Sequence, residues 1–157
     1  MGKQTVYDVD ITTSVPPERL LAAATDFSKR RPVLWPNINR KLYRVFSIGD
    51  HTADVEEGTA PVHHRYRYEW TDDGTVRATT IEASAMTTGS IWELQLRPRP
   101  GSGSTVHIHV EMGFKGPMGA LGKLMMLFNG GGAATYRRWF MKTLAVLEST
   151  NGATSSD

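Results

Sequence analysis

Apolar and polar residues alternate at a period of two through much of the chain up to Met112. In the clearest run, four apolar residues enclose three polar ones: Val106, Ile108, Val110 and Met112, with His107, His109 and Glu111 between them. Successive side chains of a strand point to opposite faces, so this run predicts a strand with one buried face. The same criterion predicts further strands near residues 7–11, 42–48, 52–57, 63–71, 75–84 and 92–96. The Asp72-Asp73-Gly74 sequence is typical of a hairpin turn.

Two short helical segments are predicted between the first two strands. Ser14 precedes Val15-Pro16-Pro17-Glu18, and proline is tolerated in the first turn of a helix. This helix should turn four apolar side chains inward: Leu20, Leu21, Ala24 and Phe27. Pro32 and Pro36 then interrupt the chain, which favours a second short helix or an irregular turn before the next strand.

A helical pattern runs from about Gly116 to Glu148 but contains Gly130-Gly131-Gly132. Glycine inside a helix costs about 0.5 to 1 kcal/mol relative to alanine, so the sequence predicts two helical pieces. The pieces carry two apolar stripes that we expect to face the sheet: Leu121, Leu124, Met125 and Phe128, then Ala133, Tyr136, Phe140, Leu144 and Leu147. We interpret the stripes as core, with a flexible gate over a cavity as the alternative.

The order of these elements predicts an α+β fold. We expect a seven-stranded antiparallel sheet wrapped around a long C-terminal helix, with two short helices between strands 1 and 2. A helix laid across the open face of a curved sheet encloses a cavity rather than a solid core. The 157 residues fit one domain, which we assign to residues 1–148. Residues 149–157 are small and polar, and we predict a disordered tail there.

Several short sequences carry a resemblance to a known superfamily. They are Val15-Pro16-Pro17-Glu18-Arg19, Asp26-Phe27, Trp35-Pro36-Asn37-Ile38, Tyr68-Glu69-Trp70, Ser90-Ile91-Trp92-Glu93-Leu94 and the stretch from Arg138 to Glu148. With this order of elements, the chain from about Thr5 to Glu148 resembles the SRPBCC or START-like superfamily. The likeness is greatest to its bacterial polyketide cyclase/dehydrase and lipid-transport branch. The resemblance implies the helix-grip fold.

The resemblance implies a ligand-binding protein without identifying the ligand, because a shared fold does not determine function. Our preferred hypothesis is binding, carriage or sensing of a small hydrophobic or amphipathic molecule between sheet and helix. The alternatives are a polyketide cyclase, aromatase or dehydratase, and a protein-interaction module such as a toxin-antitoxin component. An enzyme should gather polar groups deep in the pocket, a carrier should have a mostly apolar lining, and an interaction module should have a filled core.

A cavity between sheet and helix should be lined by large apolar and aromatic side chains. The predicted ligand-binding residues are Trp35, Tyr66, Tyr68, Trp70, Trp92, Met112, Met125, Phe128, Tyr136 and Phe140. His64 has the same parity as Tyr66 and Tyr68, so it should also face inward, and it is the one candidate general acid or base. The alternative for His64 is that it orients a ligand or satisfies core polar groups. Glu82 could point either way, because its strand alternates weakly.

The sequence supports neither a cofactor nor a metal centre. Residues 116–123 and 130–132 fail as a phosphate-binding loop and as a dinucleotide fingerprint, so no cofactor is expected. His107 and His109 stand two residues apart on one strand face, where Glu93 or Glu111 could add an oxygen ligand to a metal. We favour a solvated outer surface for both histidines and assign no metal site.

Composition restricts the class of protein further. There is no cysteine, which excludes disulfides and thiolate metal sites and agrees with a bacterial, cytoplasmic protein. No leader or membrane-spanning stretch is apparent, since the most apolar run covers only residues 124–128. The net charge is +2, and the basic clusters at residues 29–31 and 137–138 are interpreted as solvated. Nucleic acid is not expected as a partner, whereas a protein or membrane surface near Trp139 is an alternative.

Overall fold

The computed structural model describes residues 4–59 and 62–152 and contains one antiparallel sheet of seven strands. The strands are β1 (Thr5–Thr13), β2 (Arg44–Ile48), β3 (Thr52–Thr59), β4 (Val62–Trp70), β5 (Thr75–Ala83), β6 (Ile91–Pro98) and β7 (Ser104–Met112). Their order across the sheet is β1-β7-β6-β5-β4-β3-β2, so every neighbouring pair except β1–β7 is consecutive in the chain. The predicted fold class is confirmed.

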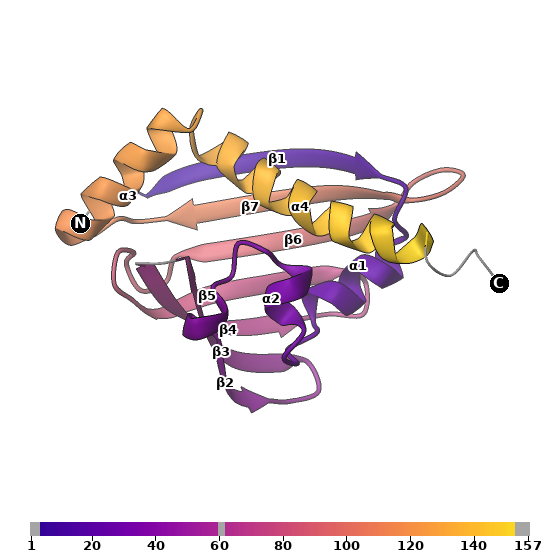
Figure 1. Cartoon of the computed structure of the whole chain (residues 1–157), viewed down its shortest axis with the longest axis horizontal. Coiled ribbons are helices and arrows are strands. Elements are labelled where there is room, and N and C mark those ends of the chain that lie inside the picture. Colours follow the sequence, from indigo (N-terminus) through magenta and orange to yellow (C-terminus); the bar gives the residue numbers. More distant parts are fainter. Residues whose placement is uncertain (1–3, 60–61, 153–157) are drawn as a thin grey trace.

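Helices cover one face of this sheet (Figure 1). They are α1 (Pro17–Ala24), α2 (Arg31–Leu34), α3 (Gly116–Phe128) and α4 (Gly132–Gly152), and a 3-10 turn lies at Arg40–Leu42. The long helix α4 runs obliquely across the sheet, and α1 and α2 lie beside its C-terminal half (Figure 1). The Arg19 guanidinium donates to the Leu147 carbonyl at 3.0 Å, which ties α1 to the end of α4.

The main core fills the space between α1, α4 and the inner face of the sheet. Its fully buried members come from the alternating positions of the central strands: Val55, Val76, Leu94, Leu96, Val106, Ile108 and Val110. On α4, the stripe formed by Phe140, Leu144 and Leu147 is buried against them. Period-two alternation on the strands and helical spacing on α4 therefore bury the same side chains that the sequence pattern selected.

The long helix is interrupted where the three consecutive glycines were expected to disturb it. Gly130 and Gly131 have φ angles of +88° and +96°. Residues other than glycine avoid such positive φ angles. The Gly131 N–H donates to the Met126 carbonyl and the Gly130 N–H to the Leu127 carbonyl, the pattern that closes a helix C-terminus. A Cβ at Gly132 would lie 2.2 Å from the Tyr7 ring, so glycine also lets α4 approach β1.

The expected orientation of α3 is wrong. Its predicted inward stripe is largely exposed, and Phe128 is 82% accessible to solvent. The side that α3 turns to the protein is that of Gly119, the only buried residue of the helix. A Cβ at Gly119 would lie 2.7 Å from the Ala85 carbonyl oxygen, so the helix packs closely through its glycine face and leaves larger apolar side chains outside.

The C-terminal helix also extends further than the sequence suggested. We expected a disordered tail from Ser149, but α4 continues to Gly152. Side-chain hydrogen bonds from Ser149 to the Val146 carbonyl and from Thr150 to the Leu147 carbonyl accompany this last turn. Residues 153–157 of the predicted tail lie outside the described residues.

Two glycine-to-alanine changes should have opposite effects on stability. Gly131→Ala places a side chain at a positive φ angle and should lower the free energy of unfolding by about 1 to 2 kcal/mol. Gly122→Ala lies within α3 and should raise it by about 0.5 to 1 kcal/mol. A Cβ would meet no atom within 4 Å at either position, so the contrast isolates backbone conformation. Urea unfolding monitored by circular dichroism measures both, and equal effects would contradict the helix break.

Candidate functional site: an aromatic cavity

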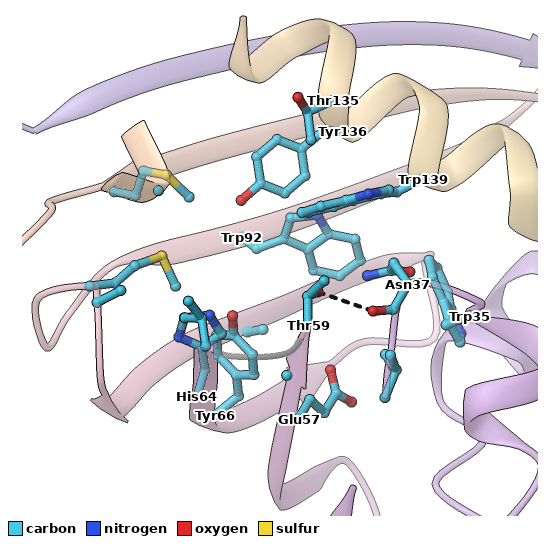
Figure 2. A pocket seen from close by; sticks show the side chains of 18 of the residues that line it. Trp35, Asn37, Glu57, Thr59, His64, Tyr66, Trp92, Thr135, Tyr136 and Trp139 are labelled. Carbon is cyan, nitrogen blue, oxygen red and sulfur yellow. Dashed lines mark hydrogen bonds between the residues drawn. The ribbon is translucent and has the colours of Figure 1, made fainter. Parts of the chain in front are cut away.

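A cavity of about 310 Å³ lies between the inner face of the sheet and the helices α2, α3 and α4. Its volume is at the lower end of the range of about 300 to 1,000 Å³ that is typical of small-molecule sites. Strands β3 to β7 form one wall, and α4 forms the opposite wall with Thr135, Tyr136, Trp139 and Phe140. Met125 and Met126 of α3 close one end. Figure 2 shows the side chains converging on this space from strands and helices far apart in the sequence.

Aromatic rings make up much of the lining. Trp35 lies edge-on to Trp92, with ring centroids 6.1 Å apart, and 6.0 Å from the ring of Phe140. Tyr136 and Trp139 of α4 form a second edge-to-face pair, with ring centroids 5.2 Å apart. The indole N–H of Trp35 donates to the Ala23 carbonyl at 3.0 Å, so this ring has a satisfied polar group and a defined orientation. The walls are therefore apolar, and neighbouring rings hold one another in place.

The structure brings most of the predicted ligand-binding residues into this cavity. Those that line it are Trp35, Tyr66, Tyr68, Trp92, Met112, Met125, Tyr136 and Phe140. Met125 is placed there although the stripe to which it was assigned is mainly exposed. The ligand-binding role of these residues stays a prediction.

Trp70 and Phe128 lie outside the cavity. Trp70 stands at the end of β4, where its ring centroid lies 5.7 Å from that of Phe27. Phe128 is the last residue of α3 and points into solvent because that helix packs through Gly119. For Trp70 the strand parity was correct but the position along the strand was wrong. For Phe128 the helical spacing could not show which side of α3 meets the protein.

A buried ion pair forms the polar end of the cavity. The Arg31 guanidinium donates to the Glu57 carboxylate, and the two side chains are only 3% and 8% exposed. The Tyr68 hydroxyl donates to the other Glu57 oxygen at 2.9 Å, and Arg31 also donates to the Ala24 carbonyl at 3.0 Å. The guanidinium lies 4.4 Å from the centre of the Phe27 ring. Glu57 thus lines the cavity as a carboxylate whose negative charge is compensated by Arg31.

The electrostatics agree with this arrangement. Burial disfavours the charged guanidinium, but the neighbouring Glu57 carboxylate and Tyr68 phenol together outweigh that effect and leave the pKa of Arg31 above its ordinary value. Burial raises the pKa of Tyr68, and the negative Glu57 raises it further. Burial likewise raises the pKa of Tyr66 and Tyr136, so all three phenols remain neutral hydrogen-bond donors near neutral pH.

Sequence interpretation missed this pair. The sequence pattern predicts a solvated basic cluster of Lys29, Arg30 and Arg31, which is wrong for Arg31 and agrees with the exposure of the other two. Glu57 had a usable signal, because it continues the inward parity of Ala53 and Val55 on β3. A carboxylate at an inward position needs a buried cation or donor, and that requirement could have directed attention to Arg31.

His64 faces the cavity, as its parity on β4 predicted. Its ring lies 5.6 Å from that of Tyr66, and its Nδ1 atom is buried without a hydrogen-bond partner among the described residues. Burial, together with the nearby His63, lowers the pKa of His64 to about 4. The imidazole is therefore neutral at physiological pH. Glu82, for which the sequence pattern allows either orientation, is exposed on the opposite face of the sheet.

A second polar group without a partner lies across the cavity from His64. Asn37 contributes its side chain to the lining, and its Oδ1 is buried with no hydrogen-bond partner in the described part of the chain. The backbone carbonyl of Asn37 accepts from the Thr59 hydroxyl at 3.0 Å, which ties the segment after α2 to β3 (Figure 2). His64 and Asn37 can therefore satisfy polar groups of a bound molecule.

Within residues 4–59 and 62–152, none of the helices has the combination of length and hydropathy that a membrane-spanning helix needs.

Replacing Glu57 should be far more damaging than replacing another glutamate. Glu57→Gln leaves the Arg31 cation buried without its counter-charge and should lower the free energy of unfolding by about 3 to 5 kcal/mol. Glu82→Gln, on the exposed face of strand β5, is the matched control and should change it by less than about 0.5 kcal/mol. Urea unfolding measures both variants. A small effect of Glu57→Gln would mean that the ion pair does not stabilise the fold.

His64 should make stability depend on pH. Its pKa is about 4 when folded and near 6.5 when unfolded, so between these values only the unfolded chain binds the proton. The stabilising contribution is complete above pH 6.5 and is lost as the pH falls toward 4, by roughly 2 to 3 kcal/mol. Between pH 7 and pH 4.5, the free energy of unfolding of His64→Gln should therefore fall less than that of the wild type, because the variant lacks the contribution of His64. His63→Gln, an exposed neighbour, should retain most of it, because burial is the larger cause of the lowered pKa of His64. Identical profiles for both variants would contradict the burial of His64.

Comparison with known proteins identifies the fold of this chain but not its chemistry. No protein-family model matches the sequence, and no curated protein matches it. Among solved structures, a truncated norcoclaurine synthase from Thalictrum flavum aligns with a TM-score of 0.69 and 9% identity, covering 93% of this chain and 94% of that chain. The Zhui aromatase/cyclase from Streptomyces sp. R1128 aligns with a TM-score of 0.63 and 9% identity, covering 72% of this chain and 70% of that chain.

A third structure carries the superfamily name. The START superfamily protein from Mycobacterium smegmatis aligns with a TM-score of 0.56 and 11% identity, covering 94% of this chain and 93% of that chain. Identities this low show shared architecture and do not transfer a substrate or a catalytic residue. The chain therefore has the START-like helix-grip fold, as its sequence resemblance predicted.

Proposed function

We propose that this protein binds a small amphipathic molecule, with an apolar and partly aromatic body, in order to carry or sense it. The observation that supports this most is the composition of the cavity. Aromatic and aliphatic side chains form most of its wall, while His64 and Asn37 offer polar atoms that no described residue satisfies. Such a site favours a ligand whose body is apolar and which has one or a few hydroxyl or amide groups.

The neutral state of His64 supports binding over proton-transfer catalysis. A general base is most effective when its pKa lies near the working pH, whereas that of His64 is lowered to about 4. The other strong polar group, Glu57, is held by Arg31 and Tyr68. Both groups suit recognition of a ligand hydroxyl or amide better than removal of a proton.

Helix α3 is the element that we expect to control entry. It contributes Gly122, Met125 and Met126 to the cavity and is separated from α4 by Gly130 and Gly131. Only Gly119 of this helix is buried, which indicates that α3 makes few contacts with the rest of the protein. Flexible methionines tolerate ligands of different shapes. A rotation of α3 about the glycine break would widen the cavity without disturbing the α4 core.

A polyketide cyclase, aromatase or dehydratase is the second candidate. The convergence of His64, Tyr66 and Tyr136 on one cavity favours it, and an aromatase/cyclase is among the proteins of similar fold. For this function His64→Gln should retain ligand affinity and slow turnover by about 10² to 10⁴. The third alternative, an interaction module, was expected to have a filled core and has less support because a cavity is present.

Ligand binding should quench tryptophan fluorescence and raise the melting temperature. Trp35, Trp92 and Trp139 all line the cavity. A ligand that binds only the folded state stabilises it by about 2.7 kcal/mol at a hundredfold excess over its dissociation constant. The panel should contain a fatty acid, a sterol and hydroxylated aromatic polyketides, tested on protein that mass spectrometry shows to be ligand-free. We expect the hydroxylated aromatic compounds to bind most tightly.

A blocking variant makes this test specific. Gly122→Phe should fill the cavity from α3 and weaken binding at least tenfold, because a Cβ at this position meets no atom within 4 Å and the ring can enter the open space. Gly122→Ala is the matched control and should bind like the wild type. Equal binding by wild type and Gly122→Phe would place the ligand elsewhere. Absence of binding across the whole panel would contradict the carrier hypothesis, and product formation that depends on His64 would favour the enzyme.

A further inference from the structure

A cluster of imidazole and carboxylate groups lies on the outer face of the sheet, away from the cavity. The antiparallel register of β1 and β7 places Asp8 opposite His109 and Asp10 opposite His107. On the same strand β7, Val106, Ile108 and Val110 are buried on the inner face, so the two histidines point outward. The sequence alone could pair the histidines only with glutamates, because Asp8 is 101 residues from His109 along the chain.

Asp8 sits between the two imidazole rings. Its Oδ1 lies 2.7 Å from His109 Nδ1 and 3.2 Å from His107 Nε2. One ligand atom from each of the three residues lies within 4.8 Å of the other two. Around tetrahedral zinc, with bonds of about 2.0 to 2.2 Å, ligand atoms stand roughly 3.4 Å apart. These three groups therefore need only small side-chain shifts to surround one ion.

The opposite nitrogen of each ring is held by a different carboxylate. His107 Nδ1 lies 2.8 Å from Asp10 Oδ1, and His109 Nε2 lies 2.9 Å from Glu111 Oε1. When histidine binds a metal, its other ring nitrogen commonly donates to a carboxylate, which sets the tautomer and orients the ring. Both rings have this arrangement here, and the remaining nitrogen of each ring, His107 Nε2 and His109 Nδ1, faces Asp8.

The charge around the cluster favours a cation. Asp8, Asp10 and Glu111 contribute three carboxylates, and Glu93 lies beside them on β6. Of the cationic side chains nearby, Arg77 is bound to Glu93 at 2.6 Å, and Arg137 donates to the Asp10 backbone carbonyl rather than to its carboxylate. The His107 and His109 side chains are 34% and 29% exposed, so an ion can reach them from solution.

We propose that Asp8, His107 and His109 form a binding site for a divalent transition-metal ion, zinc in particular, on the outer face of the sheet. Two imidazoles and one carboxylate suit zinc, whereas magnesium and calcium prefer oxygen ligands throughout. Three protein ligands leave one tetrahedral position for water. Because its ligands come from both β1 and β7, a bound ion would join the two strands that meet at the only non-consecutive pairing in the sheet.

The experiment is a zinc titration of tag-free, chelator-treated protein in competition with a chromophoric chelator. We expect one zinc ion per chain, with affinity reduced at least tenfold in His107→Gln and in His109→Gln. His51→Gln is the matched control, because His51 also contacts an aspartate, Asp72, at 3.1 Å but lies outside the cluster. It should bind zinc like the wild type. Asp10→Asn should weaken binding by about tenfold to a hundredfold through the orientation of His107.

A measurement on the wild type avoids dependence on the folding of variants. In nitrogen-15 spectra of the imidazole rings, one equivalent of zinc should shift the signals of His107 and His109 and leave those of His51 and His63 unchanged. Excess magnesium should not reverse the shifts. Failure to bind one equivalent of zinc, or equal changes at all these histidines, would overturn the proposal and leave the cluster as histidine–carboxylate ion pairs only.

Discussion

The buried ion pair between Arg31 and Glu57 is the interaction on which the cavity depends. Arg31 begins α2, Glu57 lies on β3, and Tyr68 of the adjacent strand β4 donates to the same carboxylate. The guanidinium also donates to the Ala24 carbonyl at the end of α1. One buried charge pair therefore joins two helices to two strands. Removing either partner would leave an uncompensated charge away from water, so the arrangement tolerates little variation.

The same pair explains why a carboxylate can face an otherwise apolar cavity. An isolated buried carboxylate would be strongly destabilising, but Glu57 accepts from both Arg31 and Tyr68. His64, directly opposite Glu57 in the β3–β4 register, is neutral because burial disfavours its charged form. The cavity thus contains polar groups without a free charge, which agrees with the proposed recognition of an amphipathic, uncharged molecule.

The two faces of the sheet have separate chemistry because strand side chains alternate. On β7, Ile108 and Met112 line the cavity, while His107 and His109 point to the opposite face and belong to the proposed metal cluster. A zinc ion on the outer face would contact none of the cavity side chains. It would instead hold β1 to β7, and β1 in turn supports the start of α4 through the contact between Tyr7 and Gly132. The two proposals can therefore succeed or fail independently.

Local sequence patterns determined much of this architecture. Alternation on β4 was enough to turn His64, Tyr66 and Tyr68 inward, and three consecutive glycines were enough to divide the last helix, because both effects act between near neighbours. Only the tertiary structure decided which elements meet. It paired Arg31 with Glu57, turned Phe128 outward because Gly119 packs against Ala85, and brought Asp8 to His109 through strand register. These outcomes depend on the packing of segments distant in the chain, which no periodicity within a single segment encodes.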